Sequence, residues 1–329
     1  MRILAFCPFT LDTVGGNVVT LKRVREELGR RGHTMEIYSV NPRMNEEDIQ
    51  EVVSSSKPDL LHFYHAFKTG IFLPSFPGIP SVVTLSGTDV AHDLGEADRR
   101  RVIKAAMNGA GAVLTYNQSH AIRIRTLFPE VTSKIAVLPK GVTLGTDPFD
   151  PGIEGFLFFH PGGIRPVKNN LFAVESVSSL GSEAHLLVAG PVLDEKYGEQ
   201  FRDRISSFQR GHYQERIPHE AMGTAYARAD VVLNTSLSEG ISNALIEAMV
   251  AGRPILASDV PGNRDLIESG KTGILYHSAE DFQVQAKRLE EEDSLRRDLG
   301  AAARAHALKT FSTEREVDAL LAAYQAALS

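Results

Sequence analysis

Two glutamates in one short segment could hold a polar ligand. Glu239 and Glu247 belong to the stretch 236–249, which follows a strand-like run. Ser242 or Asn243 is suited to cap a helix there, which would leave Glu239 in the loop above the N-terminus and Glu247 about one turn inside. The two carboxylates then cannot form a side-by-side acid/base couple. We expect them to bind hydroxyls on either side of a phosphate held by the N–H groups between them; the alternative is that both are ordinary surface charges.

A second segment brings basic groups to the end of another strand-like run. Residues 161–170 contain Gly162-Gly163, then Arg165 and Lys168. A turn that delivers an arginine and a lysine to the carboxyl end of a strand can neutralise a diphosphate without a metal ion. This segment therefore predicts the diphosphate side of the same ligand site.

A glycine pair lies directly after the first strand-like run. Gly15 and Gly16 precede a helical segment, so the backbone could approach a ligand closely and direct helix N–H groups at an anion. The full Gly-x-Gly-x-x-Gly fingerprint of dinucleotide-binding proteins is absent, which argues against a dehydrogenase. A plain tight turn is the alternative interpretation.

The sequence contains no convincing metal-binding motif. His62 and His65 are three residues apart, but they belong to a strand-like run, where that spacing places them on opposite faces. We interpret them as core or lining residues and expect neither a metal nor another bound cofactor.

The composition is that of a globular protein. The chain has 329 residues, 43% hydrophobic and 23% charged, which is enough for two average domains or one large one. A single cysteine excludes a disulfide scaffold. The apolar stretches are far shorter than the ~20 residues of a membrane-spanning helix, and the N-terminus lacks a signal-peptide pattern. We therefore expect a cytoplasmic protein without a transmembrane segment.

The charge distribution argues against nucleic acid as a partner. The formal net charge is −6, whereas a phosphate backbone is held mainly by clustered lysine and arginine. One local basic run occurs at 99–104, with Arg123 and Arg125 further on. It is either a solvated helix face or a contact for an anionic acceptor or a lipid surface, in which case the protein would touch membranes peripherally.

Strand-like and helical segments alternate along the whole chain. The strand-like runs are continuously apolar, as in strands covered on both faces, and they fall at 3–6, 35–40, 60–64, 81–85, 112–116, 135–138, 156–159, 185–189, 231–234, 254–257 and 273–276. Val18, Leu21, Val24 and Leu28 predict an amphipathic helix that closes at Gly32. The order is that of β-α-β units built twice.

Turn-forming residues at 141–152 suggest a domain boundary near residue 150. We expect an α/β fold with two Rossmann-like α/β/α domains that face each other across a cleft. The expected divisions are an acceptor-side domain at 1–150, a donor domain at 151–312 and a closing helix at 313–329. Ligands of such sheets bind at the carboxyl ends of the strands.

The second half resembles a known enzyme family through an ordered set of motifs. They are Gly-x-Arg-Pro-Val-Lys at 163–168, Leu-Val-Ala-Gly-Pro at 187–191, Tyr-Ala-Arg-Ala-Asp at 226–230, the Ser-x-x-Glu-Gly segment with its second glutamate and Ala-Met at 236–249, Pro-Gly-Asn at 261–263 and Gly-Lys-Thr-Gly-Ile-Leu at 270–275. This order is similar to that of retaining glycosyltransferases of the GT-B fold, family 4. Within that family the chain most resembles the glycosyltransferase 1 domain-containing protein 1 group, which shares Gly-Thr-Asp, here at 87–89.

The resemblance implies roles for the charged residues. Glu247 would hold the ribose hydroxyls of a nucleoside diphosphate sugar, and Glu239 would contact the donor sugar on its reacting face. Lys168, together with Arg165, would stabilise the departing diphosphate. Anomeric configuration would be retained. Because no side chain is a clear covalent nucleophile, we expect the acceptor to attack on the same face, with the donor phosphate as base.

The resemblance also implies a set of donor-binding residues. The backbone of Gly240, Ile241, Ser242 and Asn243 would bind phosphate and sugar. The segment around Ile217 would pack on the base. The remaining expected contacts are glycines: Gly163 in the donor domain, and Gly15 and Gly16 from the other domain.

Two departures from the family pattern bear on activity. Many members have histidine where this chain has Ser86, and the usual phosphate-site arginine after a glycine is displaced to Arg165. A hexosyltransferase with an unknown glycan, lipid-linked or small-molecule acceptor is the favoured function. The alternatives are a non-catalytic nucleotide-sugar-binding protein and a GT-B sugar-nucleotide epimerase.

Overall fold

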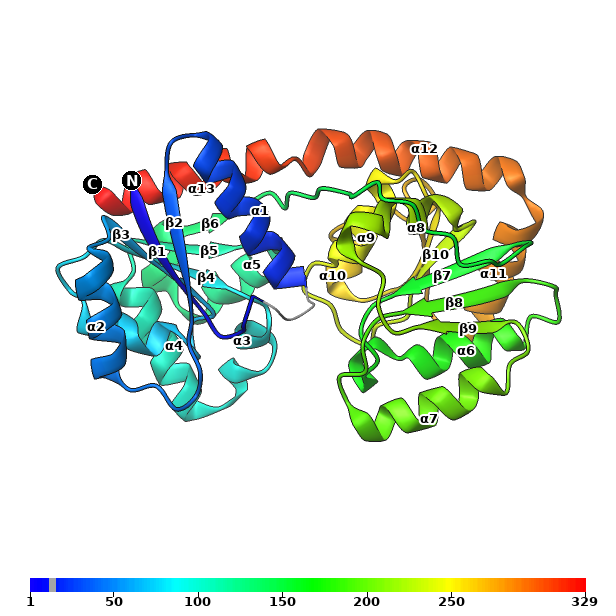
Figure 1. Ribbon diagram of the computed structural model, residues 1–329, viewed down its shortest axis with the longest axis horizontal. Coiled ribbons are helices and arrows are strands. Elements are labelled where there is room, and N and C mark those ends of the chain that lie inside the picture. Colours follow the sequence, from blue (N-terminus) through cyan, green and yellow to red (C-terminus); the bar gives the residue numbers. More distant parts are fainter. Residues whose placement is uncertain (12–15) are drawn as a thin grey trace. The chain divides into compact units, whose positions relative to one another are not determined.

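Two six-stranded parallel sheets form the framework of the protein, seen here in a computed structural model that describes residues 1–11 and 16–329 (Figure 1). The chain divides into two compact units: unit 1 comprises Met1–Gly141 and Phe311–Ser329, and unit 2 comprises Val142–Thr310. Each unit has its own sheet and its own hydrophobic core.

The sheet of unit 1 has the order β2-β1-β3-β4-β5-β6. Its strands are β1 (Arg2–Cys7), β2 (Thr34–Ser39), β3 (Leu60–Tyr64), β4 (Ser81–Leu85), β5 (Ala112–Thr115) and β6 (Ile135–Val137). Its helices are α1 (Gly16–Arg30), α2 (Glu46–Ser56), α3 (Thr88–Ala91), α4 (Ala97–Gly109), α5 (Gln118–Leu127) and α13 (Thr313–Leu328), with 3₁₀ turns η1 (Gly70–Ser75), η2 (Asp93–Gly95) and η3 (Pro129–Lys134). Every residue of β3 and β4 is buried, as expected for strands with helices on both faces.

Helices cover both faces of this sheet. On one face, α1 and α13 lie side by side and bury residues such as Leu21, Leu28 and Leu320 against the strands (Figure 1). On the other, α2, α4 and α5 contribute Ile49, Ile103 and other apolar residues. The apolar face of α1 is the one that the three- and four-residue spacing predicts.

The sheet of unit 2 has the order β12-β11-β10-β7-β8-β9. Its strands are β7 (Leu157–Pro161), β8 (His185–Ala189), β9 (Gly211–Gln214), β10 (Val231–Asn234), β11 (Ile255–Ser258) and β12 (Ile274–Tyr276). Its helices are α6 (Asn170–Ser178), α7 (Glu195–Ser206), α8 (Met222–Arg228), α9 (Asn243–Val250), α10 (Pro261–Arg264), α11 (Ala279–Glu291) and α12 (Asp293–Thr310), with 3₁₀ turns η4 (Pro166–Lys168) and η5 (His219–Ala221). The helices α6, α7 and α11 share one core with the strands.

The units divide after Gly141, earlier than the expected boundary near residue 150. The reason is that the turn-rich segment packs on unit 2: the Asp147 N–H donates to the Glu220 carbonyl at 2.7 Å, and the Gly223 N–H donates to the Gly145 carbonyl at 3.0 Å. The return to unit 1 likewise begins at Phe311, two residues earlier than the sequence predicts.

Candidate functional site

The topology of unit 2 marks one position as a natural ligand site. From β7 the chain proceeds outward through β8 and β9 on one side, then restarts beside β7 with β10 and continues to β12. The loops after β7 and β10 therefore leave the carboxyl edge in opposite directions. Open parallel sheets bind ligands in the crevice at such a switch point.

Close backbone approaches fix the loop after β7. Gly162 has φ of +149° and Gly190 has φ of +153°, and a Cβ on Gly190 would overlap the carbonyl of Gly162. The Ile164 N–H donates to the Pro191 carbonyl at 2.8 Å. A Cβ on Gly163 would lie 2.5 Å from a methyl carbon of Leu193. This loop needs small residues because it packs on the loop after β8. It leads into η4, whose last residue is Lys168.

Lys168 and Glu239 form an ion pair at the switch point. Their side chains are 17% and 10% exposed, so the pair is largely withdrawn from solvent but still reachable. The Glu239 carboxylate also accepts hydrogen bonds from the Ser236 hydroxyl at 2.7 Å and the Asn234 amide at 3.2 Å. Burial acts to raise the pKa of Glu239, but the Lys168 charge and these hydrogen bonds outweigh it and hold the pKa below its usual value.

A buried histidine and a threonine join the two loops beneath this pair. The Thr235 hydroxyl donates to the Lys168 carbonyl at 2.9 Å, so it accepts from Nε2–H of His160, also at 2.9 Å. Burial, together with the Lys168 charge, lowers the pKa of His160 to about 4. His160 is therefore a neutral structural group at pH 7. The Leu237 N–H adds a bond to the Val167 carbonyl at 2.9 Å.

Glu247 lies in α9, where Ser242 is the N-cap residue with extended backbone but makes no side-chain capping bond. The Glu247 side chain is buried, and the Tyr226 hydroxyl donates to its Oε2 at 2.9 Å. Burial and the adjacent carboxylate raise the pKa of Tyr226 well above its ordinary value. The first turn of α9 lies between Glu239 and Glu247 in the sequence. Backbone N–H groups in the first turn of an α-helix have no acceptor within their own helix.

A network of small polar residues supports the loop after β10, and the sequence analysis missed it. Asn263 donates to the Ser258 carbonyl at 2.9 Å and to Asn234 Oδ1 at 3.3 Å, and the Ser258 hydroxyl donates to the Ser236 carbonyl at 2.6 Å. A Cβ on Gly262 would overlap the carbonyl oxygens of Gly240 and Glu239. The available signal was polar residues directly at the carboxyl ends of apolar strands, because polar side chains that are buried there need hydrogen-bond partners in the neighbouring loops.

The remaining expected site residues are distributed as follows. Arg165 is exposed, and within the described residues the contacts of Glu239 do not include its guanidinium. Ile217 is buried in unit 2. Gly16 begins α1 in unit 1, and Gly15 lies outside the described residues.

The histidines and the basic run of unit 1 have structural partners. His62 is fully buried, with Nδ1 2.7 Å from the Tyr324 hydroxyl and Nε2 2.6 Å from Thr84 Oγ1. In the basic run, the ion pairs are Arg99 with Asp93 and Glu96, Arg101 with Asp98, and Lys104 with Glu130, while Arg100 and Arg125 donate to backbone carbonyls. The run is thus largely neutralised by its own neighbours, which favours the solvated helix face. In residues 1–11 and 16–329 no group of three or more histidine, cysteine or acidic side chains is arranged to hold a metal ion.

Solved structures share the fold of this chain. Over 99% of both chains, the structure superposes on HepE from Anabaena with a TM-score of 0.79 and 17% identity. It superposes on sucrose-phosphate synthase from Thermosynechococcus elongatus over 98% of both chains, with a TM-score of 0.84 and 16% identity. Two Rossmann-like α/β/α units of this kind form the GT-B fold of glycosyltransferases.

The sequence of unit 2 matches a family of known enzymes. Residues 148–306 match the family described as glycosyl transferases group 1. It is 26% identical to glycosyltransferase 1 domain-containing protein 1 of Xenopus tropicalis, covering 97% of this chain and 96% of the relative. It is 23% identical to N-acetyl-alpha-D-glucosaminyl L-malate synthase of Bacillus anthracis, covering 81% and 74% respectively. Among the described helices, none has the length and apolar character needed to span a bilayer.

Proposed function

We propose that this protein is a family 4 glycosyltransferase that moves a hexosyl group from a nucleoside diphosphate sugar to an acceptor hydroxyl, with retention of the anomeric configuration. The observation that carries the proposal is the Lys168–Glu239 pair at the switch point of unit 2, next in sequence to the helix that contains Glu247. Support also comes from the similar structure of HepE, which was crystallised with UDP and glucose.

Under this proposal, the charged groups bind different parts of the donor. Glu247, held by Tyr226, would bind the ribose hydroxyls, and Glu239 would bind hydroxyls of the donor sugar. Lys168 would stabilise the departing diphosphate, helped by Arg165 and the N–H groups at residues 240–243. The buried, hydrogen-bonded setting of Glu239 and Glu247 favours hydroxyl binding, because an ionised carboxylate accepts strong hydrogen bonds. Ile217 would pack against the base.

In the proposed reaction, an oxygen of the acceptor bonds to the anomeric carbon while the bond from that carbon to the diphosphate oxygen breaks. The acceptor proton passes to a diphosphate oxygen on the same face. Negative charge accumulates on the diphosphate as the bond breaks, and a preorganised cation at that position acts where the charge develops. One such donor contributes ~3 kcal/mol to the transition state.

The proposal assigns the positive charge to protein groups rather than to a divalent cation. The ammonium of Lys168 and the first-turn donors of α9 are the groups in question. Under this proposal, a chelator such as EDTA leaves the rate of nucleoside diphosphate release unchanged. Loss of activity with EDTA and its recovery with Mg²⁺ or Mn²⁺ would contradict the metal-independent form of the mechanism.

Nucleotide binding is tested by thermal shift with UDP, GDP, ADP and their glucose conjugates. A ligand at ~100 times its dissociation constant adds about 2.7 kcal/mol to the stability of the native state. We expect one base to raise the melting temperature clearly above the others. The absence of a shift with every nucleotide would refute the donor site.

Turnover is tested with Lys168→Met, which removes the charge but keeps the aliphatic stem. We expect kcat for nucleoside diphosphate release to fall by two orders of magnitude or more, because the leaving group loses its cation. Glu247→Gln, in contrast, should chiefly weaken donor binding. The matched control is Lys271→Met, which removes an exposed lysine that pairs with Glu268. A Lys168→Met enzyme with wild-type kcat would rule out the assigned role.

A non-catalytic nucleotide-sugar-binding protein is the second candidate, and Ser86 is the observation that favours it. This residue replaces a histidine common in the family, and its backbone N–H donates to Asp89 at 3.1 Å. The two candidates separate cleanly, because the binding protein would show the thermal shift with a sugar nucleotide but release no nucleoside diphosphate with any acceptor.

A further inference from the structure

Unit 1 has a switch point of its own, between β1 and β3, and a histidine lies directly on it. The chain moves from β1 outward to β2 and restarts on the other side with β3. His65 is the first residue after β3, and its φ is +87°. Histidine is one of the few non-glycine residues enriched in this region, and backbone strain of this kind concentrates at functional positions.

Hydrogen bonds select one tautomer of the His65 ring. The Lys68 N–H donates to Nδ1 at 3.2 Å, so in the neutral ring Nδ1 is the acceptor and Nε2 carries the proton. That Nε2–H donates to Thr88 Oγ1 at 3.1 Å. Burial lowers the pKa of His65, against the opposing effect of Asp89. The ring is therefore neutral at pH 7, with its proton directed at Thr88.

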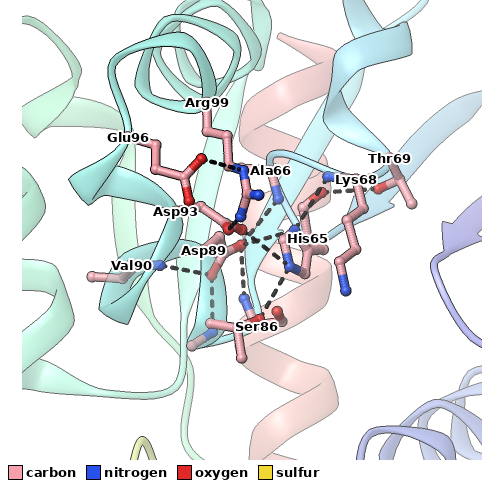
Figure 2. A network of polar contacts seen from close by, with 12 residues as sticks. His65, Ala66, Lys68, Thr69, Ser86, Asp89, Val90, Asp93, Glu96 and Arg99 are labelled. Atoms are coloured by element: carbon pink, nitrogen blue, oxygen red, sulfur yellow. Dashed lines mark hydrogen bonds and ion pairs between the residues drawn. The ribbon is translucent and has the colours of Figure 1, made fainter.

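Asp89 fixes the two loops that carry this pair (Figure 2). Its carboxylate is fully buried and accepts four backbone N–H bonds, from Ala66, Ser86, Gly87 and Val90, at 2.9 to 3.1 Å. The first of these donors follows β3 and the others follow β4. The Gly-Thr-Asp motif thus has a structural function, which is to hold the loop of Thr88 against the loop of His65.

A second carboxylate faces the same imidazole. Asp93 Oδ1 accepts from Arg99 at 2.7 Å, and Asp93 Oδ2 lies 3.6 Å from His65 Nε2 (Figure 2). Among the described atoms, Asp93 Oδ2 is buried and has no hydrogen-bond partner. The aspartate is only 5% exposed, and its carboxylate lies on the Nε2 side of the ring, which favours the tautomer with the proton on Nε2.

Thr88 is exposed, unlike the groups that hold it. Its Oγ1 already accepts a hydrogen bond from Nε2–H of His65, so its own O–H is available to donate. We propose that Thr88 donates a hydrogen bond to a hydroxyl oxygen of the acceptor substrate and that His65 is the positioning residue that sets the direction of this bond. The inference rests on the proposed function, because the charged groups assigned to the donor lie on unit 2 and none of them lies at the switch point of unit 1.

Four variants separate the two roles. Thr88→Val removes the hydroxyl, and Thr88→Ser keeps it. His65→Asn retains an oxygen that can accept from the Lys68 N–H, and asparagine tolerates positive φ, but its side chain is too short to reach Thr88. The control Thr126→Val removes a hydroxyl of α5 that bonds the Ile122 carbonyl of its own helix.

The assay measures nucleoside diphosphate release from the sugar nucleotide that stabilises the chain most, with D-glucose, glycerol and myo-inositol as hydroxyl probes. We expect Thr88→Val to lower kcat/KM for the probe about tenfold, mostly through KM, and Thr88→Ser to stay within about twofold. His65→Asn should resemble Thr88→Val, and the double variant should lose little more than either single variant. The thermal shift by the nucleotide should be unchanged in all of them.

The experiment distinguishes failure of the proposed function from failure of this inference. A wild-type protein without any nucleotide shift overturns the proposed function and this inference together. A wild-type protein that binds nucleotide but releases no nucleoside diphosphate with any probe overturns this inference and favours the non-catalytic candidate. A Thr88→Val variant with wild-type kcat/KM overturns this inference alone. Nitrogen-15 NMR of the histidine rings adds a test that needs no activity, since a proton on Nδ1 of His65 at pH 7.5 would also overturn it.

Discussion

Lys168 and Glu239 form an ion pair inside the proposed donor site, so a bound diphosphate would share the ammonium with a carboxylate. The carboxylate repels the phosphate but binds hydroxyls of the sugar. Its charge therefore opposes binding of the nucleoside diphosphate product and favours binding of the sugar. Glu239 therefore weakens binding of the free nucleoside diphosphate and strengthens binding of the donor sugar.

We predict that Glu239→Gln binds the nucleoside diphosphate about fivefold more tightly than the wild type, equivalent to about 1 kcal/mol, while kcat for transfer falls. The reason is that the neutral amide no longer competes for Lys168. Isothermal titration with the free diphosphate and a rate assay measure the two effects. Weaker diphosphate binding by Glu239→Gln would show that the pair is needed intact to form the site.

The buried hydrogen bond between Tyr226 and Glu247 provides a test of stability. We expect Tyr226→Phe to lower the free energy of unfolding by about 1.5–3 kcal/mol, because a buried carboxylate loses a donor. The comparison variant is Tyr213→Phe, whose half-buried hydroxyl donates to the neutral carbonyl of Gly190 at 2.9 Å and should contribute about 1 kcal/mol. Urea denaturation followed by circular dichroism measures the unfolding free energy of both variants. A larger loss for Tyr213→Phe than for Tyr226→Phe would contradict the buried bond between Tyr226 and Glu247.

Residue types were predictable from the sequence, but their contacts were not. Glu239 and Lys168 follow different strands, and only the strand order makes β7 and β10 neighbours. The same limit applies to His65 and Thr88: the strand-like run around His65 indicated a lining residue, but not that its proton is directed at a residue after the next strand.

At the scale of elements, glycine positions determine how the loops of the site can pack. We predict opposite effects for one substitution at two places. Gly262→Ala should lower both stability and nucleotide affinity, because the added methyl group displaces the backbone of residues 239–240. Gly29→Ala, in the last turn of α1 with no heavy atom within 4 Å of the new carbon, should raise the unfolding free energy by up to about 1 kcal/mol. Thermal melts with and without nucleotide report both; a Gly262→Ala protein with unchanged nucleotide affinity would refute the packing argument.

The strands were the most predictable elements, since continuous apolar runs are the direct mark of a parallel sheet buried on both faces. β9 is the exception among the strands described here. It consists of Gly211–Gln214, is polar and only partly buried, and pairs with β8 alone at the edge of its sheet. An edge strand has one neighbour, so it does not need the apolar composition that makes inner strands recognisable.

At the scale of the whole molecule, each unit buries a neutral histidine in its core. The pKa of His62 is lowered to about 3 and that of His160 to about 4, in both cases mainly by burial. Because these folded-state values lie below the ordinary 6.5, the unfolded chain binds more protons at acidic pH. The stability contribution is complete above pH 6.5 and is lost as the pH falls from 6.5 toward 4 and 3.

We predict that the free energy of unfolding decreases by about 1.4 kcal/mol per pH unit for each histidine in this window, or about 2 kcal/mol each at pH 5 relative to pH 7. The chain has no tryptophan, so circular dichroism in urea is the suitable measurement. His160→Gln should reduce the pH dependence of the unfolding free energy in the transition that includes unit 2. If the change of unfolding free energy with pH stays the same, His160 is not the titrating group.

The route of the chain through the two units has a consequence for biosynthesis. Unit 2 is one continuous stretch, but unit 1 receives α13 only after all of unit 2 has been translated. Until then, α1 is already available to cover its part of this face, but the strand surface that contacts Leu320 and Tyr324 stays exposed. The part made first is therefore the part finished last, and we expect its sheet to expose apolar surface until α13 has been made.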